Sequence, residues 1–381
     1  MIVMGKIQNI LITGGAGFIG SHLADALINK GYFVRVLDNL EPQVHGDQQK
    51  KPNYLNEKIE FIQGDIQDLD IIKKSIIDID AIYHFAANVG VGQSMYQIDK
   101  YISVNTQGTA RLFDYLVNGE HSIQKILVAS SMSIYGEGKY NCSKCGVVSP
   151  KGRQLVDLKA KQWDLKCPAC RNILVPIPTD ELKPLYSTSI YAQSKRHQEE
   201  MSILIGQTYG IPTVALRFFN VYGTRQALSN PYTGVCAIFS SRLKNNNPPI
   251  IYEDGLQSRD FIHINDLISA NILALEKQAA NYEILNVGTG IATPILDLAK
   301  IFIQIMQVKT EPQVLNQYRK GDIRHCFADI TKIKKKLGFK PKIQLQDGLK
   351  DLIEWVNSQI EVEDKFETVE SELQKHGLKL N

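Results

Sequence analysis

The sequence predicts an α/β fold built on a doubly wound, mostly parallel sheet. Three observations support this prediction: an apolar strand that runs into a glycine-rich turn and a helix, apolar strands that alternate with helical segments as far as residue 218, and polar loops that follow the strand ends. In sheets of this kind, ligands bind beyond the carboxyl ends of the strands. We therefore expect the functional residues to follow strands.

The composition of the 381 residues is that of a soluble globular protein. Hydrophobic residues make up 44% and charged residues 22% of the chain. The formal net charge of +3 gives no reason to expect nucleic acid or a membrane surface as a partner. No apolar run approaches the roughly 18 residues that a membrane-spanning helix requires, and the N-terminal residues lack the pattern of a signal peptide. We therefore expect a cytoplasmic protein that binds neither nucleic acid nor membrane.

The N-terminal residues have the order of a dinucleotide-binding βαβ unit. A short apolar run, residues 7–12, continues into the glycine-rich residues 13–20 and then into a helical pattern. A second apolar run, residues 33–37, ends at Asp38. An acidic residue about 20 positions beyond the glycines completes the pattern of a Rossmann-type unit. The sequence therefore predicts a dinucleotide whose pyrophosphate lies at the N-terminus of the first helix.

Each special position has its own expected function in this unit. Gly14 permits the tight turn, Gly17 lets the backbone approach the pyrophosphate, and Gly20 lets the helix and strand pack closely. Asp38 is expected to accept hydrogen bonds from the adenosine ribose hydroxyls. The next residue, Asn39, is not basic, so the 2′-phosphate of NADP would meet only repulsion. NAD is therefore the predicted cofactor.

Further cofactor contacts are expected at the ends of the next strands. Asp65 and Ile66 are placed to flank an adenine, whereas Ala86 and Ala87 are small enough to let a cofactor lie close. The complete set of predicted cofactor-binding residues is Gly14, Gly17, Phe18, Ile19, Gly20, Asp38, Asn39, Asp65, Ile66, Ala86, Ala87, Asn105, Tyr191 and Lys195.

The candidate catalytic residues follow a later strand, residues 126–129. Ser131 comes directly after this strand, and Tyr191 and Lys195 lie four positions apart on one face of a predicted helix. The ammonium of Lys195 is expected to favour the phenolate and to lower the pKa of Tyr191 toward neutral, which makes Tyr191 a candidate general acid/base. Ser131 could hold the same substrate oxygen. His84 is interpreted as structural rather than catalytic.

Four of the six cysteines form two C-x-x-C pairs between the candidate serine and tyrosine. Cys142 with Cys145, and Cys167 with Cys170, could place four thiolates around one Zn²⁺, as in a zinc ribbon. The alternatives are reduced free thiols or redox-active cysteines. Because four sulfur ligands close the coordination shell, the predicted zinc is structural. The other two cysteines are interpreted as core thiols.

Together, the glycine loop, Asp38, Ser131, Tyr191 and Lys195 resemble the extended short-chain dehydrogenase/reductase family, specifically its nucleotide-sugar epimerases and dehydratases. The resemblance covers roughly residues 6–356. It implies a Rossmann-type doubly wound parallel sheet with a smaller C-terminal substrate-binding region, here carrying an inserted zinc ribbon.

Residues 84–96, the four-cysteine insert and residues 230–235 are most similar to bacterial dTDP-L-rhamnose 4-epimerases. Those enzymes interconvert dTDP-L-rhamnose and dTDP-6-deoxy-L-talose. The resemblance also implies a homodimer, with a four-helix contact that includes the helix of Tyr191. Open alternatives are a UDP-hexose 4-epimerase, a net 4-ketoreductase or dehydrogenase, a non-catalytic NAD-binding scaffold and a zinc-ribbon nucleic-acid binder.

The resemblance implies the substrate contacts position by position. Arg259 and Arg319 are expected to clamp the substrate diphosphate, Asn220 to present a donor to it, and Asp322 to bind a hydroxyl of the nucleotide ribose. The implied catalytic residues are Ser131, Tyr191 and Lys195. The implied substrate-binding residues are Ser131, Ser133, Asn220, Arg259, Arg319 and Asp322.

One absence bears on the reaction. The family's 4,6-dehydratases carry an Asp-Glu pair directly after the catalytic Ser or Thr, whereas this chain has Met132 and Ser133 there. Neither side chain can act as the acid or base of a dehydration, so oxidation and reduction at a single carbon are expected.

The expected division of the chain has five segments. The zinc-ribbon insert is expected to form a rim of the sugar pocket or a subunit contact. The segments are residues 6–138, the first part of the NAD-binding Rossmann domain; 139–176, the zinc-ribbon-like insert; 177–218, the Rossmann domain continued; 219–356, mainly the sugar-nucleotide-binding region; and 357–381, a charged C-terminal surface helix and tail.

Overall fold

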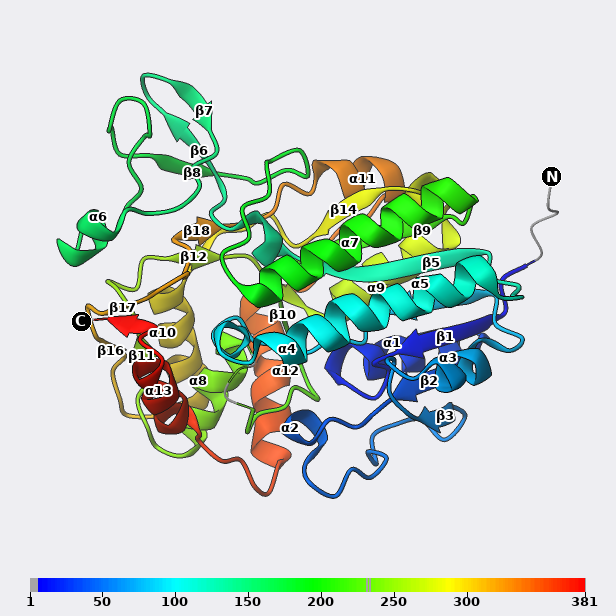
Figure 1. The fold of residues 1–381 in the computed structure, drawn as a ribbon. Helices are drawn as coiled ribbons and strands as arrows, with labels where there is room; N and C mark the ends of the chain where they lie inside the picture. The colour runs from blue at the N-terminus through cyan, green and yellow to red at the C-terminus, as the bar shows by residue number, and fades with distance from the viewer. Residues whose placement is uncertain (1–5, 231, 233, 381) are drawn as a thin grey trace.

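Seven parallel strands form the central sheet of the protein, in the order β14-β9-β5-β4-β1-β2-β3 (Figure 1). The structure, a computed structural model, describes residues 6–230, 232 and 234–380. The predicted doubly wound, parallel α/β fold is confirmed. The strands are β1 (Asn9–Thr13), β2 (Phe33–Asp38), β3 (Glu60–Gln63), β4 (Ala81–His84), β5 (Lys125–Ser131), β9 (Thr213–Phe218) and β14 (Ile284–Val287).

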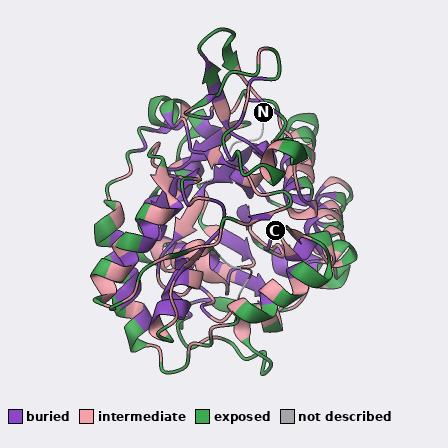
Figure 2. Ribbon diagram, turned by 90° about the vertical axis from the view of Figure 1, so that its left-hand side faces the viewer, coloured by how far each residue is buried: buried purple, intermediate pink, exposed green. Residues whose placement is uncertain are grey.

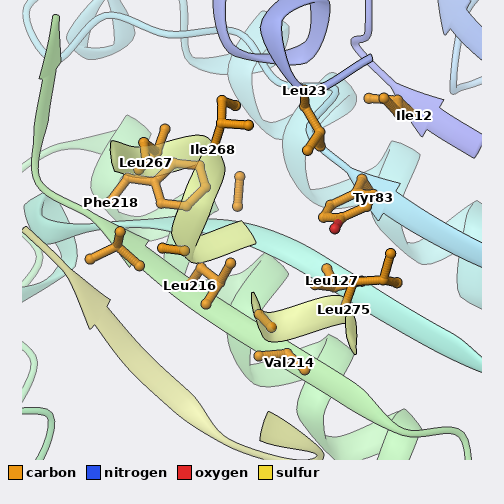
Figure 3. Close-up of a cluster of buried hydrophobic side chains, with 14 of the residues drawn as sticks. Ile12, Leu23, Tyr83, Leu127, Val214, Leu216, Phe218, Leu267, Ile268 and Leu275 are labelled. Atoms are coloured by element: carbon orange, nitrogen blue, oxygen red, sulfur yellow. The ribbon is translucent and has the colours of Figure 1, made fainter. Parts of the chain in front are cut away.

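Helices cover both faces of this sheet, as the apolar character of its strands requires. Ile126, Leu127 and Val128 of β5 are all 0% exposed, since a parallel strand buries both of its faces. In the close-up of Figure 3, Leu216 and Phe218 of β9 lie near side chains of α9. One face is covered by α1 (Phe18–Asn29), α9 (Ile264–Glu276) and α11 (Thr331–Leu337), the other by α3 (Leu69–Ile76), α5 (Gly108–Asn118) and α7 (Ile190–Tyr209).

The predicted boundary at residue 219 does not separate the sheet from the substrate-binding region. The edge strand β14 and the helices α9 and α11 lie within residues 219–356, yet they complete the central sheet and its cover. Strand β14 pairs with β9 in parallel, from Ile284 opposite Ala215 to Val287 opposite Phe218. A strand of four residues carries too weak a pattern to be assigned to a sheet from the sequence.

The rest of this segment forms a smaller region with a hydrophobic core of its own. Its helices α8 (Val235–Lys244), α10 (Ile295–Met306) and α12 (Leu345–Ser358) bury Phe239, Phe302 and Leu352 against one another. Cys236 lies in this core and Cys326 in the core of the sheet, so both are buried thiols as predicted. Within the described residues, no helix has the length and apolar character that crossing a membrane requires.

The insert is a small three-stranded antiparallel sheet that projects from the body of the molecule (Figure 1). It has its own small core, in which Tyr140, Leu165 and Leu174 surround Cys142 and Cys167. Most of its outer residues are exposed (Figure 2). Its elements are β6 (Lys139–Cys142), β7 (Gly146–Val148), β8 (Val175–Ile177) and the short helix α6 (Leu155–Lys159).

The C-terminal segment contains a helix with an exposed outer side, as the sequence predicts, but the inner side of this helix is buried, which the composition does not predict. Helix α13 (Phe366–Lys375) buries Val369 and Leu373 against the substrate-binding region. The strand that follows, β19 (Lys379–Leu380), pairs antiparallel with β17 (Tyr318–Arg319). The composition of residues 357–381 does not predict this packing, because charged residues outnumber apolar ones in this segment.

Candidate active site

One cavity of about 670 Å³ connects the carboxyl ends of the strands with the smaller C-terminal region. The glycine loop lies at one end of it, and Arg319 and Asp322 lie at the other. All the predicted cofactor-, substrate-binding and catalytic residues line this cavity except Asn105. They are Gly14, Gly17, Phe18, Ile19, Gly20, Asp38, Asn39, Asp65, Ile66, Ala86, Ala87, Ser131, Ser133, Tyr191, Lys195, Asn220, Arg259, Arg319 and Asp322.

The glycine loop has the crowding that its sequence predicts. Gly14 has a φ of +69°, and a Cβ there would lie 2.8 Å from the backbone nitrogen of Ala86. A Cβ on Gly20 would lie 2.5 Å from the carbonyl oxygen of Gly14, so helix α1 packs on the loop only because glycine is present. A Cβ on Gly17 would meet only that carbonyl, at 3.5 Å, and this position faces the cavity.

Asp38 is held at the end of β2 by two backbone groups. Its carboxylate accepts hydrogen bonds from the N–H groups of Ala16 and Leu40, both at 2.9 Å. Burial raises the pKa of Asp38, and these hydrogen bonds oppose that rise. His45 Nε2 lies 3.8 Å from the carboxylate, and burial lowers the pKa of His45. A neutral imidazole offers no cation to a 2′-phosphate, which agrees with the predicted preference for NAD.

Asn105 does not line the cavity. It is fully buried in the π-helical turn Ile102–Gln107, where its side chain bonds both backbone groups of Asn88: Oδ1 accepts from the N–H at 2.7 Å, and Nδ2 donates to the carbonyl at 3.0 Å. Asn88 lines the cavity, so Asn105 shapes the wall from behind.

His84 is also fully buried, between Thr13 and Thr109. Its Nδ1 lies 2.8 Å from the hydroxyl of Thr13 and its Nε2 lies 2.8 Å from that of Thr109. Burial lowers the pKa of His84 to about 3. The ring is therefore neutral at pH 7 and ties β1 to α5, as expected of a structural histidine.

Tyr191 and Ser131 both line the cavity, and their side chains are hydrogen-bonded to each other. The side chain of Ser189 accepts a hydrogen bond from the N–H of Ala192 at 3.1 Å, so α7 begins there and Tyr191 lies in its first turn. A hydrogen bond with the Ser131 hydroxyl lowers the pKa of Tyr191, but burial has the larger effect and raises it overall. Ser133 Oγ donates to Ser131 Oγ at 2.9 Å, which leaves the Ser131 proton for Tyr191 or a ligand.

Lys195 is buried one turn further along α7. Its ammonium donates to Oε1 of Gln198 at 2.6 Å, and burial lowers the pKa of Lys195 to about 7, although Glu199 partly opposes this. The expectation that Lys195 lowers the pKa of Tyr191 toward neutral is not met. The reason is that burial disfavours both charged forms, the phenolate and the ammonium.

The two predicted clamping arginines are held in different ways. The guanidinium of Arg259 donates to the carbonyl oxygens of Ile323 at 2.6 Å and Arg324 at 3.0 Å. Arg319 donates to the carboxylate of Asp322 at 2.8 Å and lies 4.4 Å from the ring centre of Tyr252. One oxygen of Asp322 is thus already bound by Arg319.

Asn220 supplies the clearest unfilled position at this end. Its Oδ1 is buried and has no hydrogen-bond partner among the described residues, although the residue lines the cavity. A buried polar atom without a partner is uncommon, so a donor from a bound molecule is the expected partner of Asn220 Oδ1.

The sequence reasoning missed one wall of the cavity, which the C-terminal segment forms. Phe366, Val369 and Leu373 of α13 line the cavity, and Glu372 accepts hydrogen bonds from the hydroxyl groups of Tyr96, at 2.7 Å, and Tyr232. The apolar spacing 366, 369 and 373 is that of one helix face, so a pattern for this contact was present in the sequence.

The four paired cysteines lie together in the insert, as predicted. Their Sγ atoms are all within 4.8 Å of one another, and those of Cys142 and Cys170 are 3.4 Å apart. A tetrahedron with Zn–S bonds of about 2.3 Å places its sulfur atoms about 3.8 Å apart. The donor set and its spacing therefore fit one zinc ion.

Known proteins resemble this chain over most of its length. Sequence models described as the NAD dependent epimerase/dehydratase family and as GDP-mannose 4,6 dehydratase match residues 10–150 and 174–352, respectively. The chain therefore belongs to the NAD-dependent epimerase/dehydratase family, and within that family to the nucleotide-sugar epimerases, which are isomerases.

Three relatives define its neighbourhood in that family. The dTDP-L-rhamnose 4-epimerase of Burkholderia thailandensis is 35% identical over 94% of this chain and 97% of its own length. A putative UDP-glucose 4-epimerase of Methanocaldococcus jannaschii is 33% identical over 92% of this chain and 98% of its own. The crystal structure of UDP-glucose 4-epimerase from Thermotoga maritima with UDP-glucose has a TM-score of 0.75 and 30% identity, over 93% of this chain and all of that one. The resemblance predicted from the motifs is confirmed at the level of the family.

Proposed function

We propose that this protein is an NAD-dependent nucleotide-sugar 4-epimerase that interconverts dTDP-L-rhamnose and dTDP-6-deoxy-L-talose. The observation that carries the proposal is the arrangement of one cavity: Ser131, Tyr191 and Lys195 lie between a dinucleotide loop and the arginines Arg259 and Arg319. The 35% identity with the rhamnose 4-epimerase of Burkholderia thailandensis supports this sugar.

The glycine loop and Asp38 fit NAD, because Gly17 faces the cavity without crowding and the Asp38 carboxylate lies at the end of β2. When bound, NAD supplies the chemistry of accepting a hydride from the sugar C4 and returning it to the opposite face. Tyr191 takes the proton of the 4-hydroxyl as a phenolate and later gives it back; burial disfavours this form, whereas the hydrogen bond with Ser131 and the ammonium of Lys195 favour it. Ser131 holds the same oxygen by a hydrogen bond, and buried Lys195 is placed to bind the nicotinamide ribose.

The far end of the cavity is suited to a nucleoside diphosphate. The guanidinium groups of Arg259 and Arg319 can each present two N–H donors to phosphate oxygens. Asn220 adds an unpartnered amide oxygen, which suits a hydroxyl or base N–H donor better than phosphate itself. Asp322 retains one carboxylate oxygen for a ribose hydroxyl while Arg319 binds the other.

The residues after Ser131 disfavour a dehydratase. Met132 is buried and apolar, and the Ser133 hydroxyl donates to Ser131, so neither is placed to serve as acid or base at C5 and C6. The match to the dehydratase model begins at residue 174 and does not include these two positions.

The test is to incubate the purified protein with dTDP-L-rhamnose without added cofactor and to follow the sugar by NMR and NADH by absorbance. Formation of the 4-epimer without net NADH is expected, because the same cofactor is reduced and reoxidised. Conversion of UDP-hexoses alone would replace the sugar assignment, and net formation or consumption of NADH would place the protein among the dehydrogenases or ketoreductases. Binding of NAD without turnover of any nucleotide sugar would favour a scaffold.

We also propose that Cys142, Cys145, Cys167 and Cys170 hold a structural Zn²⁺. Reduced cysteines with bound zinc suit a reducing compartment such as the cytoplasm. Elemental analysis should find one zinc per chain, and these four thiols should react with a thiol reagent only after chelation. Four thiols that react without chelation in a zinc-free protein would overturn this assignment.

A homodimer through α5 and α7 is the proposed assembly. These helices lie side by side on one face of the sheet (Figure 1), and α7 exposes 62% of Leu204 and 53% of Tyr209. Light scattering should give twice the mass of the chain for the wild type and the mass of one chain for Leu204→Glu. A monomeric wild type would exclude the dimer.

A further inference from the structure

The zinc-ribbon insert reaches the substrate end of the cavity from behind, through a buried arginine. Arg153 belongs to the insert, and its side chain is only 3% exposed. Its guanidinium lies 2.7 Å from the carboxylate of Glu253 and 3.7 Å from that of Glu137, and it donates to the carbonyl oxygen of Asp322 at 2.8 Å. No residue of 139–176, all of which the structure describes, lines the cavity. The expectation that the insert forms a rim of the sugar pocket is therefore wrong.

Two arginines hold three successive carbonyl oxygens on this short segment. Arg153 binds that of Asp322, and Arg259 binds those of Ile323 and Arg324. Arg259 lines the cavity, whereas Arg153 does not. The segment 322–324 is thus held between Arg153 of the insert and Arg259, which is predicted to bind the diphosphate. A shift of the segment's backbone would therefore displace the Arg259 guanidinium.

The outer side of the segment is anchored by further charged groups, of which Arg324 and Glu137 are buried. The N–H of Arg324 donates to both carboxylate oxygens of Glu137, at 2.8 and 3.0 Å. The Arg324 side chain, 1% exposed, binds Asp254 at 2.6 Å and Asp164 of the insert at 3.0 Å. The insert therefore contacts the segment through a second ion pair as well, which makes its position a defined one.

The insert also packs against the strand that carries Arg319. Trp163 is 7% exposed, and its ring centre lies 6.3 Å from that of Tyr318 in β17. The backbone carbonyl of Trp163 accepts a weak contact from Arg153 at 3.5 Å, so the aromatic and ionic contacts belong to one unit.

We propose that Arg153 is a positioning residue for substrate binding: it fixes the backbone of residues 322–324 so that Arg259 and Arg319 face the substrate diphosphate. This inference rests on the proposed function, because it requires a nucleoside diphosphate at this end of the cavity. Nη1 of Arg153 binds Glu253 while Nη2 donates to the Asp322 carbonyl, and a planar fork reaches these two positions together, whereas lysine has one nitrogen. Lysine at this position would keep the charge and lose one of the two contacts.

The experiment compares Arg153→Lys with the wild type in the full-length protein. Calorimetry measures the Kd for dTDP, UDP, GDP and NAD, and steady-state assays give KM and kcat for the nucleotide sugar that is turned over. Arg153→Lys should weaken nucleoside diphosphate binding and raise KM about 10- to 100-fold, which corresponds to misaligned charge-assisted hydrogen bonds. The Kd for NAD and kcat should stay close to the wild-type values, because the Arg153 side chain contacts Glu253, Glu137 and the Asp322 carbonyl, and neither the glycine loop nor Tyr191.

The matched control is Arg35→Lys. Arg35 also donates to two backbone carbonyls, those of Ser75 and Ile77, and pairs with a carboxylate, that of Glu60 at 2.9 Å. It does not line the cavity. Because the Arg35 and Glu60 side chains are 11% and 45% exposed, this substitution should lower stability by no more than Arg153→Lys does, and it should not change the Kd for the nucleoside diphosphate.

A second comparison separates positioning from simple loss of structure. In an Arg259→Met background, Arg153→Lys should weaken nucleoside diphosphate binding only through Arg319. The reason is that Arg153 is proposed to act on Arg259 through the shared segment 322–324, and this effect is lost when Arg259 is absent. If Arg153→Lys unfolds the protein, Arg153→Gln keeps an N–H donor for the Asp322 carbonyl and takes its place.

The outcomes distinguish this inference from the proposed function. A wild type that binds none of the three diphosphates refutes both. A wild type that binds one of them, with equal Kd for Arg153→Lys, refutes the positioning role alone. An equal loss in Arg35→Lys, or a fall in kcat at unchanged KM, would also overturn it, since these results indicate general destabilisation.

Discussion

A buried ion pair between Glu199 and Arg217 holds the end of β5, the strand of Ser131, and substitution of Glu199 tests its contribution directly. Glu199 is on α7 and Arg217 on β9, and their side chains are 1% and 3% exposed. Arg217 donates to both carboxylate oxygens, at 2.6 and 2.9 Å, and Ser130, next to Ser131, donates to the same carboxylate at 2.6 Å. In Glu199→Gln the shape is kept, but the guanidinium loses its counter-charge while it stays buried.

The expected cost is about 3–5 kcal/mol in the free energy of unfolding, the loss typical when one partner of a buried pair is removed. The matched control is Glu60→Gln, whose partner Arg35 lies at 2.9 Å but whose own side chain is 45% exposed, so less than about 1 kcal/mol is expected. Urea unfolding at pH 7, followed by fluorescence and circular dichroism, measures both. Equal losses in the two variants would refute the assignment of the large effect to burial.

The same substitution should move the pH dependence of activity. Glu199 opposes the lowering of the Lys195 pKa by burial, so its loss lowers that pKa further below about 7. The charged ammonium exists below its pKa, and Glu199→Gln should therefore lose activity at a lower pH than the wild type on the alkaline side. An alkaline limb that does not move would show that Lys195 does not govern it.

Three further predictions concern the reaction, the C-terminal segment and acid stability. Tyr191→Phe should lower kcat by roughly 10²- to 10⁴-fold and leave NAD content unchanged. The control is Tyr101→Phe: its ring centre lies 6.3 Å from that of Tyr191 but it does not line the cavity, so kcat should stay near the wild-type value. Equal falls in kcat would contradict the acid/base role of Tyr191. Removal of residues 360–381 should raise KM for the nucleotide sugar with little change in the Kd for NAD, because α13 lines the cavity and β19 pairs with β17, which carries Arg319. An unchanged KM would show that this wall does not contribute to substrate binding. Stability should fall as the pH drops below about 6.5, because burial holds the folded-state pKa of His84 at about 3 and the unfolded chain binds the proton first. In His84→Gln the slope of unfolding free energy against pH, measured between about pH 4 and pH 6, should be smaller by roughly 1.4 kcal/mol per pH unit, and an unchanged slope would show that this histidine does not titrate on unfolding.

The parts of the fold and site that the sequence predicts are those with local patterns. The glycine loop, Asp38 and the Tyr191–Lys195 spacing each lie within a few tens of residues, and backbone geometry alone sets their arrangement. The two C-x-x-C pairs also predict their cluster, because each pair is a short turn. In each case the residues of the pattern are close to one another in the sequence.

The parts that the sequence does not predict depend on distant contacts. Strand β14 carries only four residues, and its place next to β9 follows from tertiary packing. The composition of α13 indicates a charged surface helix, and only the tertiary structure shows that Val369 and Leu373 form part of the cavity wall. The raised pKa of Tyr191 follows from burial, which no spacing expresses. Arg153 has no motif around it, and its contact with Asp322 joins residues 169 positions apart.

The two ends of the cavity are supported by contacts of different range. The NAD end is held by contacts such as that of Asp38 with Ala16, 22 positions away, within one βαβ unit. At the substrate end, β17 is paired with the C-terminal strand β19, packs against Trp163 of the insert, and continues into the segment bound by Arg153. The insert supports this end without lining it, so we expect a relative with the same two predicted clamping arginines but a different insert to hold them differently. We therefore expect the nucleotide affinity of such a protein to depend on these supports as well as on the residues that touch the substrate.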